Sequence, residues 1–345
     1  MRLIAIKLFY FELFLLLAMN CELFAGRGDK AGTAAASELL LPIGAASIAT
    51  GNSALATVTG IEALFINPAG LARSTFQTNA MFSHVSYFAG IGIDYAAGST
   101  TLPDVASFGV SVKSLSFGKI PITTEDHPDG TGQFASPSNV IVSGAISRLV
   151  TDHIALGMSA NLVFENMENV SATGIAFSGG LQYVGLGGVD GLSVGVAINN
   201  LGPAMKYDGD GLVRTGQVDD VLRQETTYKV EAALNELPST IEVGLGYEPA
   251  LSENEQVRFT TKFQDNNFSE DEYNFGVQFT HEKFLMFRFG YELGDKPEQG
   301  EFIFGSSAGM GISTEFNGIN ITIDYAYRTA KYFGGSHVIT LIAGF

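Results

Sequence analysis

Apolar and polar residues alternate along most of the chain after residue 75. The segment 285–292 reads Leu-Met-Phe-Arg-Phe-Gly-Tyr-Glu, with an aliphatic or aromatic side chain at every odd position. The same alternation runs through 240–247, 257–264, 273–280 and 320–328. A period of two is that of a β-strand, because successive strand residues point to opposite faces, whereas a helix repeats every ~3.6 residues. The pattern therefore predicts an all-β protein.

The connections between these segments differ in length in a regular way. Counted from Gln77, about fourteen strand-like segments follow one another, an even number as in bacterial membrane barrels. Connections after even-numbered segments are short, at 151–153, 248–254, 281–283 and 317–318. Those after odd-numbered segments include the long ones, at 119–137, 206–235, 264–271 and 294–301. Short turns at one end and long loops at the other predict a transmembrane antiparallel β-barrel over residues 75–345.

The composition suits a barrel whose outer wall faces lipid. Mean hydropathy is +0.20 and only 16% of residues are charged, yet no apolar run beyond the N-terminus is long enough for a membrane helix. Tyr and Phe must form any interfacial belt, because Trp is absent. The last segment ends on Phe345, which resembles the signal read by the barrel assembly machinery. We expect Phe345 to be that assembly signal, with outer-membrane lipid and the assembly machinery as partners.

The first 25 residues have the features of an export signal. Arg2 and Lys7 precede a mostly apolar stretch that ends at Ala18, and Leu-Phe-Ala at 23–25 offers a cleavage site. We therefore expect a signal peptide at 1–25, Sec-type export and a place in the bacterial outer membrane. A lipoprotein signal ending at Cys21 is the alternative.

Residues 26–74 do not alternate. They are rich in Gly and Ala and include the run Asn67, Pro68, Ala69, Gly70, in which Asn before Pro favours a turn over a continuing helix. Small residues allow backbones to approach closely. We interpret this segment as a short plug inside the barrel, with the four-residue run as its motif.

The plug motif and several later segments resemble one family of outer-membrane proteins. The sequence Asn-Pro-Ala-Gly-Leu-Ala at 67–72 is similar to the plug of the PorV/PorQ family, itself similar to FadL-type barrels. The likeness continues in the runs at 112–118, 123–126, 196–205 and 324–327, and so covers essentially the mature chain. Thr59-Gly60 stands where the family usually has an acidic pair, and Ile66 where it has an aromatic residue.

The resemblance implies two functions. Named family members serve the type IX secretion pathway and hold exported proteins, so secreted cargo proteins or secretion-system subunits are the implied partners. FadL-type relatives pass hydrophobic small molecules across the outer membrane. We expect the first function, with FadL-like transport as the alternative; long outer loops would serve protein cargo, and an apolar lumen would serve small ligands.

Charged residues occur on the face of the strands that we expect to point into the barrel. They carry both signs and are Glu242, Arg258, Lys262, Arg288, Glu292, Asp324 and Arg328. They can form a binding or permeation path, or a network that neutralises itself around the plug, because buried charges need partners. We favour the neutralising network.

No pattern in the chain points to catalysis. The five histidines lack metal-ligand spacing, and the one cysteine lies within the expected signal peptide. The acidic runs at 208–211 and 266–272 lack the full spacing of a calcium loop. A formal net charge of −17 argues against binding of nucleic acid, which would need a basic face. We therefore assign no catalytic residue, metal or cofactor, and expect a protein that binds or transports and is not an enzyme.

Overall fold

A computed structural model describes residues 32–345 except 217–225, 250, 253 and 296–301. The expected signal peptide at 1–25 lies outside the described residues. No helix among the described residues is both long and apolar enough to cross a membrane.

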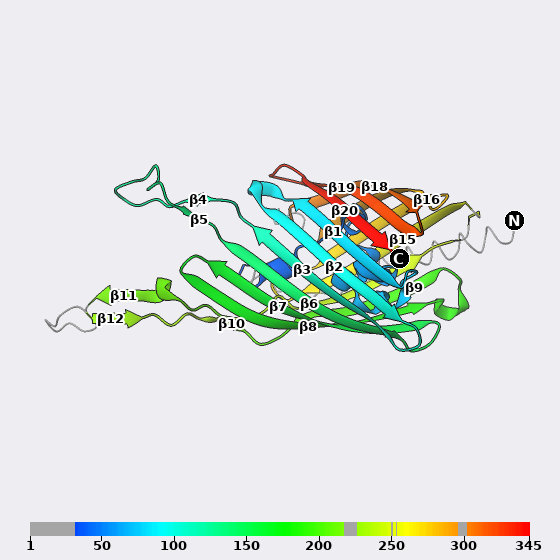
Figure 1. The fold of residues 1–345 in the computed structure, drawn as a ribbon, viewed down its shortest axis with the longest axis horizontal. Coiled ribbons are helices and arrows are strands. Elements are labelled where there is room, and N and C mark those ends of the chain that lie inside the picture. The colour runs from blue at the N-terminus through cyan, green and yellow to red at the C-terminus, as the bar shows by residue number, and fades with distance from the viewer. Residues whose placement is uncertain (1–31, 217–225, 250, 253, 296–301) are drawn as a thin grey trace.

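Fourteen antiparallel strands form a closed barrel in chain order, and the first strand pairs with the last (Figure 1). This confirms the predicted fold. The strands are β1 (Thr78–Ser86), β2 (Gly92–Leu102), β3 (Ala106–Ser116), β6 (Ser138–Leu149), β7 (Ile154–Met167), β8 (Val170–Val184), β9 (Leu192–Leu201), β14 (Thr240–Tyr247), β15 (Glu255–Asn266), β16 (Glu272–His281), β17 (Leu285–Gly294), β18 (Phe304–Phe316), β19 (Ile319–Ala330) and β20 (Ser336–Gly344).

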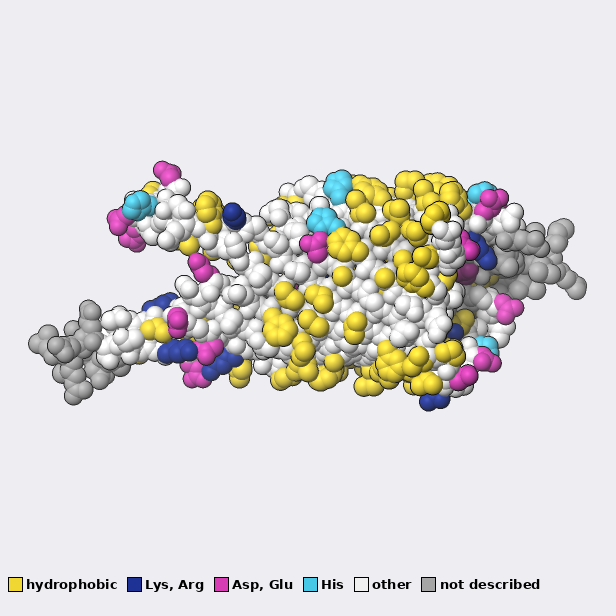
Figure 2. Space-filling view, in the orientation of Figure 1, with side chains coloured by type: hydrophobic (Ala, Val, Ile, Leu, Met, Phe, Trp, Pro, Cys, Tyr) yellow, Lys and Arg dark blue, Asp and Glu magenta, His cyan; other side chains and the backbone are white. Residues whose placement is uncertain are grey.

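The outer face of the barrel is apolar and the inner face is polar. On β17, Phe287 and Phe289 are about half exposed on the outside, whereas Arg288 between them is buried. Figure 2 shows apolar side chains spread over the barrel wall, with most charged side chains near its two ends. An outer wall of this kind suits lipid, because hydrocarbon solvates apolar side chains and a closed barrel leaves no strand edge unpaired.

The two ends of the barrel differ in the length of their connections. Three small strand pairs extend the long-loop end: β4 (Ile120–Pro121) with β5 (Phe134–Ala135), β10 (Met205–Lys206) with β13 (Leu234–Asn235), and β11 (Val213–Gly216) with β12 (Thr226–Lys229). The alternation of lengths is less regular than the sequence indicates. Residues 168–169 form a tight turn at the long-loop end, and β15 continues to Asn266, which shortens the connection expected at 264–271.

The segment before β1 lies inside the barrel as a chain of short helices (Figure 1). These are η2 (Ser37–Leu40), α2 (Ala45–Ala49), η3 (Ala54–Ala56), η4 (Gly60–Glu62), α3 (Ala63–Ile66) and η5 (Pro68–Arg73). Helix α2 contacts β17 to β20, η3 contacts β9, β14 and β15, and η5 contacts β3 and β6 to β8. The plug therefore touches most of the barrel wall. Three further short helices, η6 (Phe88–Gly90), η7 (Leu186–Gly188) and η8 (Asp210–Leu212), lie in connections.

Glycines on the inner wall make room for the plug. A Cβ atom added to Gly290 would lie 2.0 Å from the backbone nitrogen of Gly51, and one added to Gly180 would lie 1.9 Å from Oδ1 of Asn67. Real Cβ atoms do not approach other atoms this closely, so any other residue would displace the plug. The small residues on the inner face of the strands therefore serve in part to let the plug pack closely against the wall.

Candidate functional site

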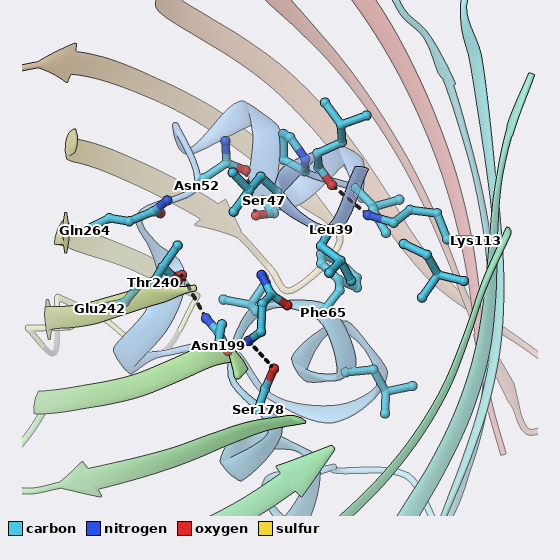
Figure 3. A pocket seen from close by; sticks show the side chains of 18 of the residues that line it. Leu39, Ser47, Asn52, Phe65, Lys113, Ser178, Asn199, Thr240, Glu242 and Gln264 are labelled. Atoms are coloured by element: carbon cyan, nitrogen blue, oxygen red, sulfur yellow. Dashed lines mark hydrogen bonds between the residues drawn. The ribbon is translucent and has the colours of Figure 1, made fainter. Parts of the chain in front are cut away.

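A cavity of about 360 Å³ lies between the plug and the barrel wall, toward the long-loop end (Figure 3). Its plug side is mainly apolar and includes Leu39, Ile43 and Phe65. Its wall side is mainly polar and includes Ser178 and Asn199. A concave site with an apolar side and a few polar groups is the usual form of a small-molecule site, because apolar contact supplies affinity and polar groups supply orientation.

The polar side is held by a chain of hydrogen bonds across three strands. Asn199 Nδ2 donates to Glu242 Oε1 over 2.8 Å, and Lys262 Nζ donates to Glu242 Oε2 over 3.1 Å. Lys262 Nζ also donates to Gln264 Oε1 over 2.7 Å. Figure 3 shows Asn199, Glu242 and Gln264 side by side along the wall. The only cation in this group is therefore already neutralised.

Aromatic rings line another part of the cavity. The rings of Phe302 and Phe304 meet edge to face, with their centroids 6.1 Å apart. The centroid of the Tyr87 ring lies 6.4 Å from that of Phe304. The Arg328 guanidinium lies 3.4 Å above the ring of Phe304. Glu272, which also lines the cavity, pairs across the strands with Gly294. A Cβ on Gly294 would lie 2.8 Å from Phe302, so the strand position opposite Glu272 packs against the aromatic part of the site.

Lys113 ties the wall to the start of the plug. Its ammonium is buried and donates to the carbonyl oxygens of Glu38 over 2.8 Å and Leu41 over 3.0 Å (Figure 3). Nearby, Glu165 Oε1 accepts from the Ala36 backbone N–H over 3.1 Å. Burial, together with the negative charge of Glu165, raises the pKa of the Glu38 carboxyl to about 7. The plug end at the cavity is thus held by polar contacts beside a carboxyl whose pKa is raised by burial.

The structure places all seven predicted lumen charges on the inner face and gives each a partner. Six pair among themselves: Arg288 with Asp324 at 2.5 Å, Lys262 with Glu242 at 3.1 Å, and Arg328 with Glu292. Arg258 pairs instead with Glu248 at 2.7 Å. Glu248 lies in the connection just after β14. The residues around it do not alternate, so the sequence gives no sign that Glu248 pairs with a lumen charge.

The plug motif anchors the plug more than it lines the cavity. Asn67 is fully buried, accepts from the Ala69 N–H over 3.2 Å and donates to the carbonyls of Leu55 and Leu181. Pro68 is the first residue of η5, a position whose N–H would have no partner within the helix, so proline costs no hydrogen bond there. A Cβ on Gly70 would lie 2.2 Å from the carbonyl oxygen of Val58. The motif therefore determines how the chain folds back on itself inside the barrel.

Phe345 lies at the rim opposite the long loops. Its ring is about half exposed, and its carbonyl accepts from the N–H groups of Gln77 and Thr78. These bonds join the last residue to the start of β1. Its role as an assembly signal stays a prediction.

Sequence reasoning missed the polar residues that join plug and wall. Gln182 donates to the carbonyls of Leu55 and Val58, over 3.2 and 2.9 Å. Glu62, in the plug, has a buried Oε1 atom without a hydrogen-bond partner among the described residues. Burial, with the charge of Asp324, raises the pKa of Glu62 to about 7. Such residues carry no sequence signal, because each is polar in a segment where polar residues are ordinary.

The histidines and acidic residues of the described part of the chain do not form a metal site. No three His, Cys, Asp or Glu side chains there converge as metal ligands. The histidines that the sequence scatters stay apart, as with His84 beside Asp94 on the outside of β1 and β2 and His153 in a turn.

No family model matches this chain, and no curated protein matches its sequence. Solved structures are similar to it in fold. The toluene transporter TbuX of Ralstonia pickettii has a TM-score of 0.56 at 14% identity, covering 88% of this chain and 98% of its own. The toluene transporter TodX of Pseudomonas putida has a TM-score of 0.54 at 14% identity, covering 87% and 96%. A FadL homologue of Pseudomonas aeruginosa has a TM-score of 0.51 at 11% identity, covering 88% and 98%. At these identities the likeness establishes the fold alone: this chain is a closed, plugged barrel with the fold of the FadL-type outer-membrane channels.

Proposed function

We propose that this protein is an outer-membrane channel that binds small hydrophobic or amphipathic molecules in its lumen and passes them inward. The observation that carries the proposal is the cavity of about 360 Å³ between plug and wall, with apolar residues on one side and polar groups on the other. Its volume falls within the range of ordinary small-molecule sites, from about 300 to about 1,000 Å³. A folded protein cargo would not enter it.

The similar solved structures support the same choice. TbuX and TodX are described as toluene transporters, and CymD, with a TM-score of 0.55, as a monoaromatic hydrocarbon channel. None of them is described as a secretion protein. Their likeness to this chain is one of fold, so the substrate class assigned here is part of the proposal.

The apolar belt of the barrel supports a place in the outer membrane. Half-exposed aromatic rings such as Phe287 and Phe289 suit hydrocarbon, and Phe345 at the closing edge suits recognition by the assembly machinery. Sec-type export and processing after Ala25 complete this part of the proposal.

Passage requires the plug to rearrange. Its contacts with the wall include many single hydrogen bonds, such as Asn67 to Leu181 and Ser147 to Ala69. The net contribution of one hydrogen bond to folding stability is only about 1 kcal/mol. A local part of the plug can therefore shift while the barrel stays folded.

Uptake by cells tests the proposal. Ser143 lines the cavity on β6, and Ile146 on the same strand faces outward. Cells that display the protein should accumulate a labelled aromatic hydrocarbon faster than cells without it. Ser143→Trp should slow that uptake because the indole fills the cavity, and Ile146→Trp should leave it unchanged. Equal uptake with and without the barrel would refute the channel function.

The long loops favour a second candidate, the secretion function implied by PorV/PorQ resemblance. The strand pair β11–β12 extends far from the barrel (Figure 1) and presents Val213 and Tyr228 on its surface. Connections of this length are uncommon unless they act in binding or are disordered. For the secretion function, this hairpin would have to bind an exported protein.

A further inference from the structure

The cavity is lined by three basic residues within the described part of the chain, and all three are engaged. Lys262 is paired with Glu242, and Arg328 is paired with Glu292. Lys113 donates two of its three hydrogens to carbonyl oxygens of the plug. The positive charges at this site are therefore used to hold the protein together.

One acidic residue of the cavity is not neutralised. Glu272, the first residue of β16, has no Lys, Arg or His partner within ion-pair distance among the described residues, and its one hydrogen bond is a marginal one from Asn266 at 3.5 Å. Glu242 and Glu272 are the two acidic residues among those that line the cavity in the described part of the chain, and of the two only Glu242 is within ion-pair distance of a basic side chain there. Glu272 is therefore the cavity carboxylate that is open to a cationic ligand.

Aromatic residues lie near the strand position of Glu272 and line the same cavity. Phe302 packs beside Gly294, the residue paired with Glu272 across β16 and β17, and Phe302 also contacts Phe304. The negative faces of aromatic rings attract cations, and amine ligands are commonly bound where rings meet a carboxylate. A carboxylate ligand would meet the like charge of Glu272 at the same place.

We propose that the cavity selects amphipathic amines, with the ammonium of the ligand at Glu272 and its apolar body against Phe302, Phe304 and the plug. This inference rests on the proposed function and specifies the substrate class of the same cavity. It goes beyond an apolar channel, because it predicts discrimination between ligands of equal shape and different charge.

Calorimetric titration of the full mature protein in a non-ionic detergent tests the inference with three ligands of matched shape. These are 4-phenylbutylamine, 4-phenylbutan-1-ol and 4-phenylbutyrate, each corrected for its heat of mixing with empty micelles. The amine should bind more tightly than the alcohol by about tenfold, as expected for a hydrogen bond to a charged group, and the carboxylate should bind least.

Two variants locate the effect. Glu272→Gln keeps the shape of the side chain and should remove the preference for the amine while binding of the alcohol persists. Glu125→Gln changes an exposed loop carboxylate away from the cavity and should leave all three affinities unchanged. Retained heat-modifiable migration on gels confirms that each variant is folded.

The outcomes separate this inference from the proposed function. Equal binding of amine and alcohol by the unchanged protein, or tightest binding of the carboxylate, would overturn the amine preference and leave the channel function standing; the second result would point to the remaining hydrogen of Lys113. An amine preference that survives in Glu272→Gln would also overturn it. Absence of binding by all three ligands, together with no uptake by cells, would remove both.

Discussion

Arg288 on β17 and Asp324 on β19 form a buried ion pair across the strand that lies between them, with 2.5 Å from Nη1 to Oδ1. The intervening strand carries Gly311 at this level, where a Cβ would lie 1.9 Å from Asp324 Oδ1. A small residue on one strand thus lets two longer side chains meet above it. Arg328 and Glu292 form a second buried ion pair between the same two strands.

Removing one member of this pair should cost more than removing both. Arg288→Ala leaves Asp324 buried without its cation, which typically costs about 3–5 kcal/mol. The double variant Arg288→Met with Asp324→Leu restores packing without charge and should recover most of that loss. Urea unfolding of the barrel in lipid vesicles measures the free energies of unfolding of the unchanged protein, of Arg288→Ala and of the double variant. A double variant less stable than Arg288→Ala would contradict the argument.

Phe287, next to Arg288 but on the outer face, tests which side of the strand meets lipid. Phe287→Arg should destabilise the barrel by about 2–4 kcal/mol, because a charge near the middle of the bilayer is poorly solvated. Phe287→Leu, which stays apolar, is the matched control. The same vesicle unfolding experiment applies, and full tolerance of Arg at this position would place the outer face elsewhere.

Gly290 should tolerate no side chain where the plug crosses it. Gly290→Ala places a methyl group against Gly51 and should cost about 1–3 kcal/mol, typical of overpacking. Gly144→Ala on β6, where no atom lies within 4 Å of the added Cβ, is the control. Protease cleavage within 45–56 should rise for Gly290→Ala alone, since a displaced plug exposes its backbone. Equal cleavage of both variants would mean that the plug does not rest on this glycine.

The start of the plug should loosen as the pH rises. The pKa of Glu38 lies at about 7 in the folded protein against 4.5 in a free chain. The folded state therefore binds the proton more tightly, and the stability linked to it is complete below pH 4.5 and lost as the pH rises toward 7. Hydrogen exchange of residues 35–43, corrected for its intrinsic pH dependence, should accelerate over this interval in the unchanged protein and much less in Glu38→Gln. The same acceleration in Glu38→Gln would assign the effect to another group.

Shortening the 206–235 connection separates the two candidate functions. Its strand pair β11–β12 makes no part of the closed barrel, so the shortened protein should still fold and reach the membrane. Loss of a defined exported protein from outer-membrane preparations, with uptake of hydrophobic compounds unchanged, would support the secretion function. Unchanged partners and uptake that depends on the barrel would favour the channel.

The sequence by itself determined the strands and their two faces. A strand turns successive side chains to opposite sides, so the alternation at 285–292 contains both the element and its orientation. Phe287 and Arg288 accordingly lie on the faces that the pattern predicts. The even strand number and the unequal connections followed from the same local pattern, which is why the barrel itself was predictable.

Only the tertiary structure decided which inner residues meet and what space they enclose. The partner of Arg288 is 36 residues away on a strand two places along the wall, a relation set by barrel closure and strand stagger and by no local period. The cavity depends likewise on the path of the plug, whose short helices turn at glycines and at Asn67 without any repeat. Likewise, that Glu272 lines this cavity without a basic partner among the described residues follows from the paired strands and the path of the plug, and no pattern in the chain indicates it.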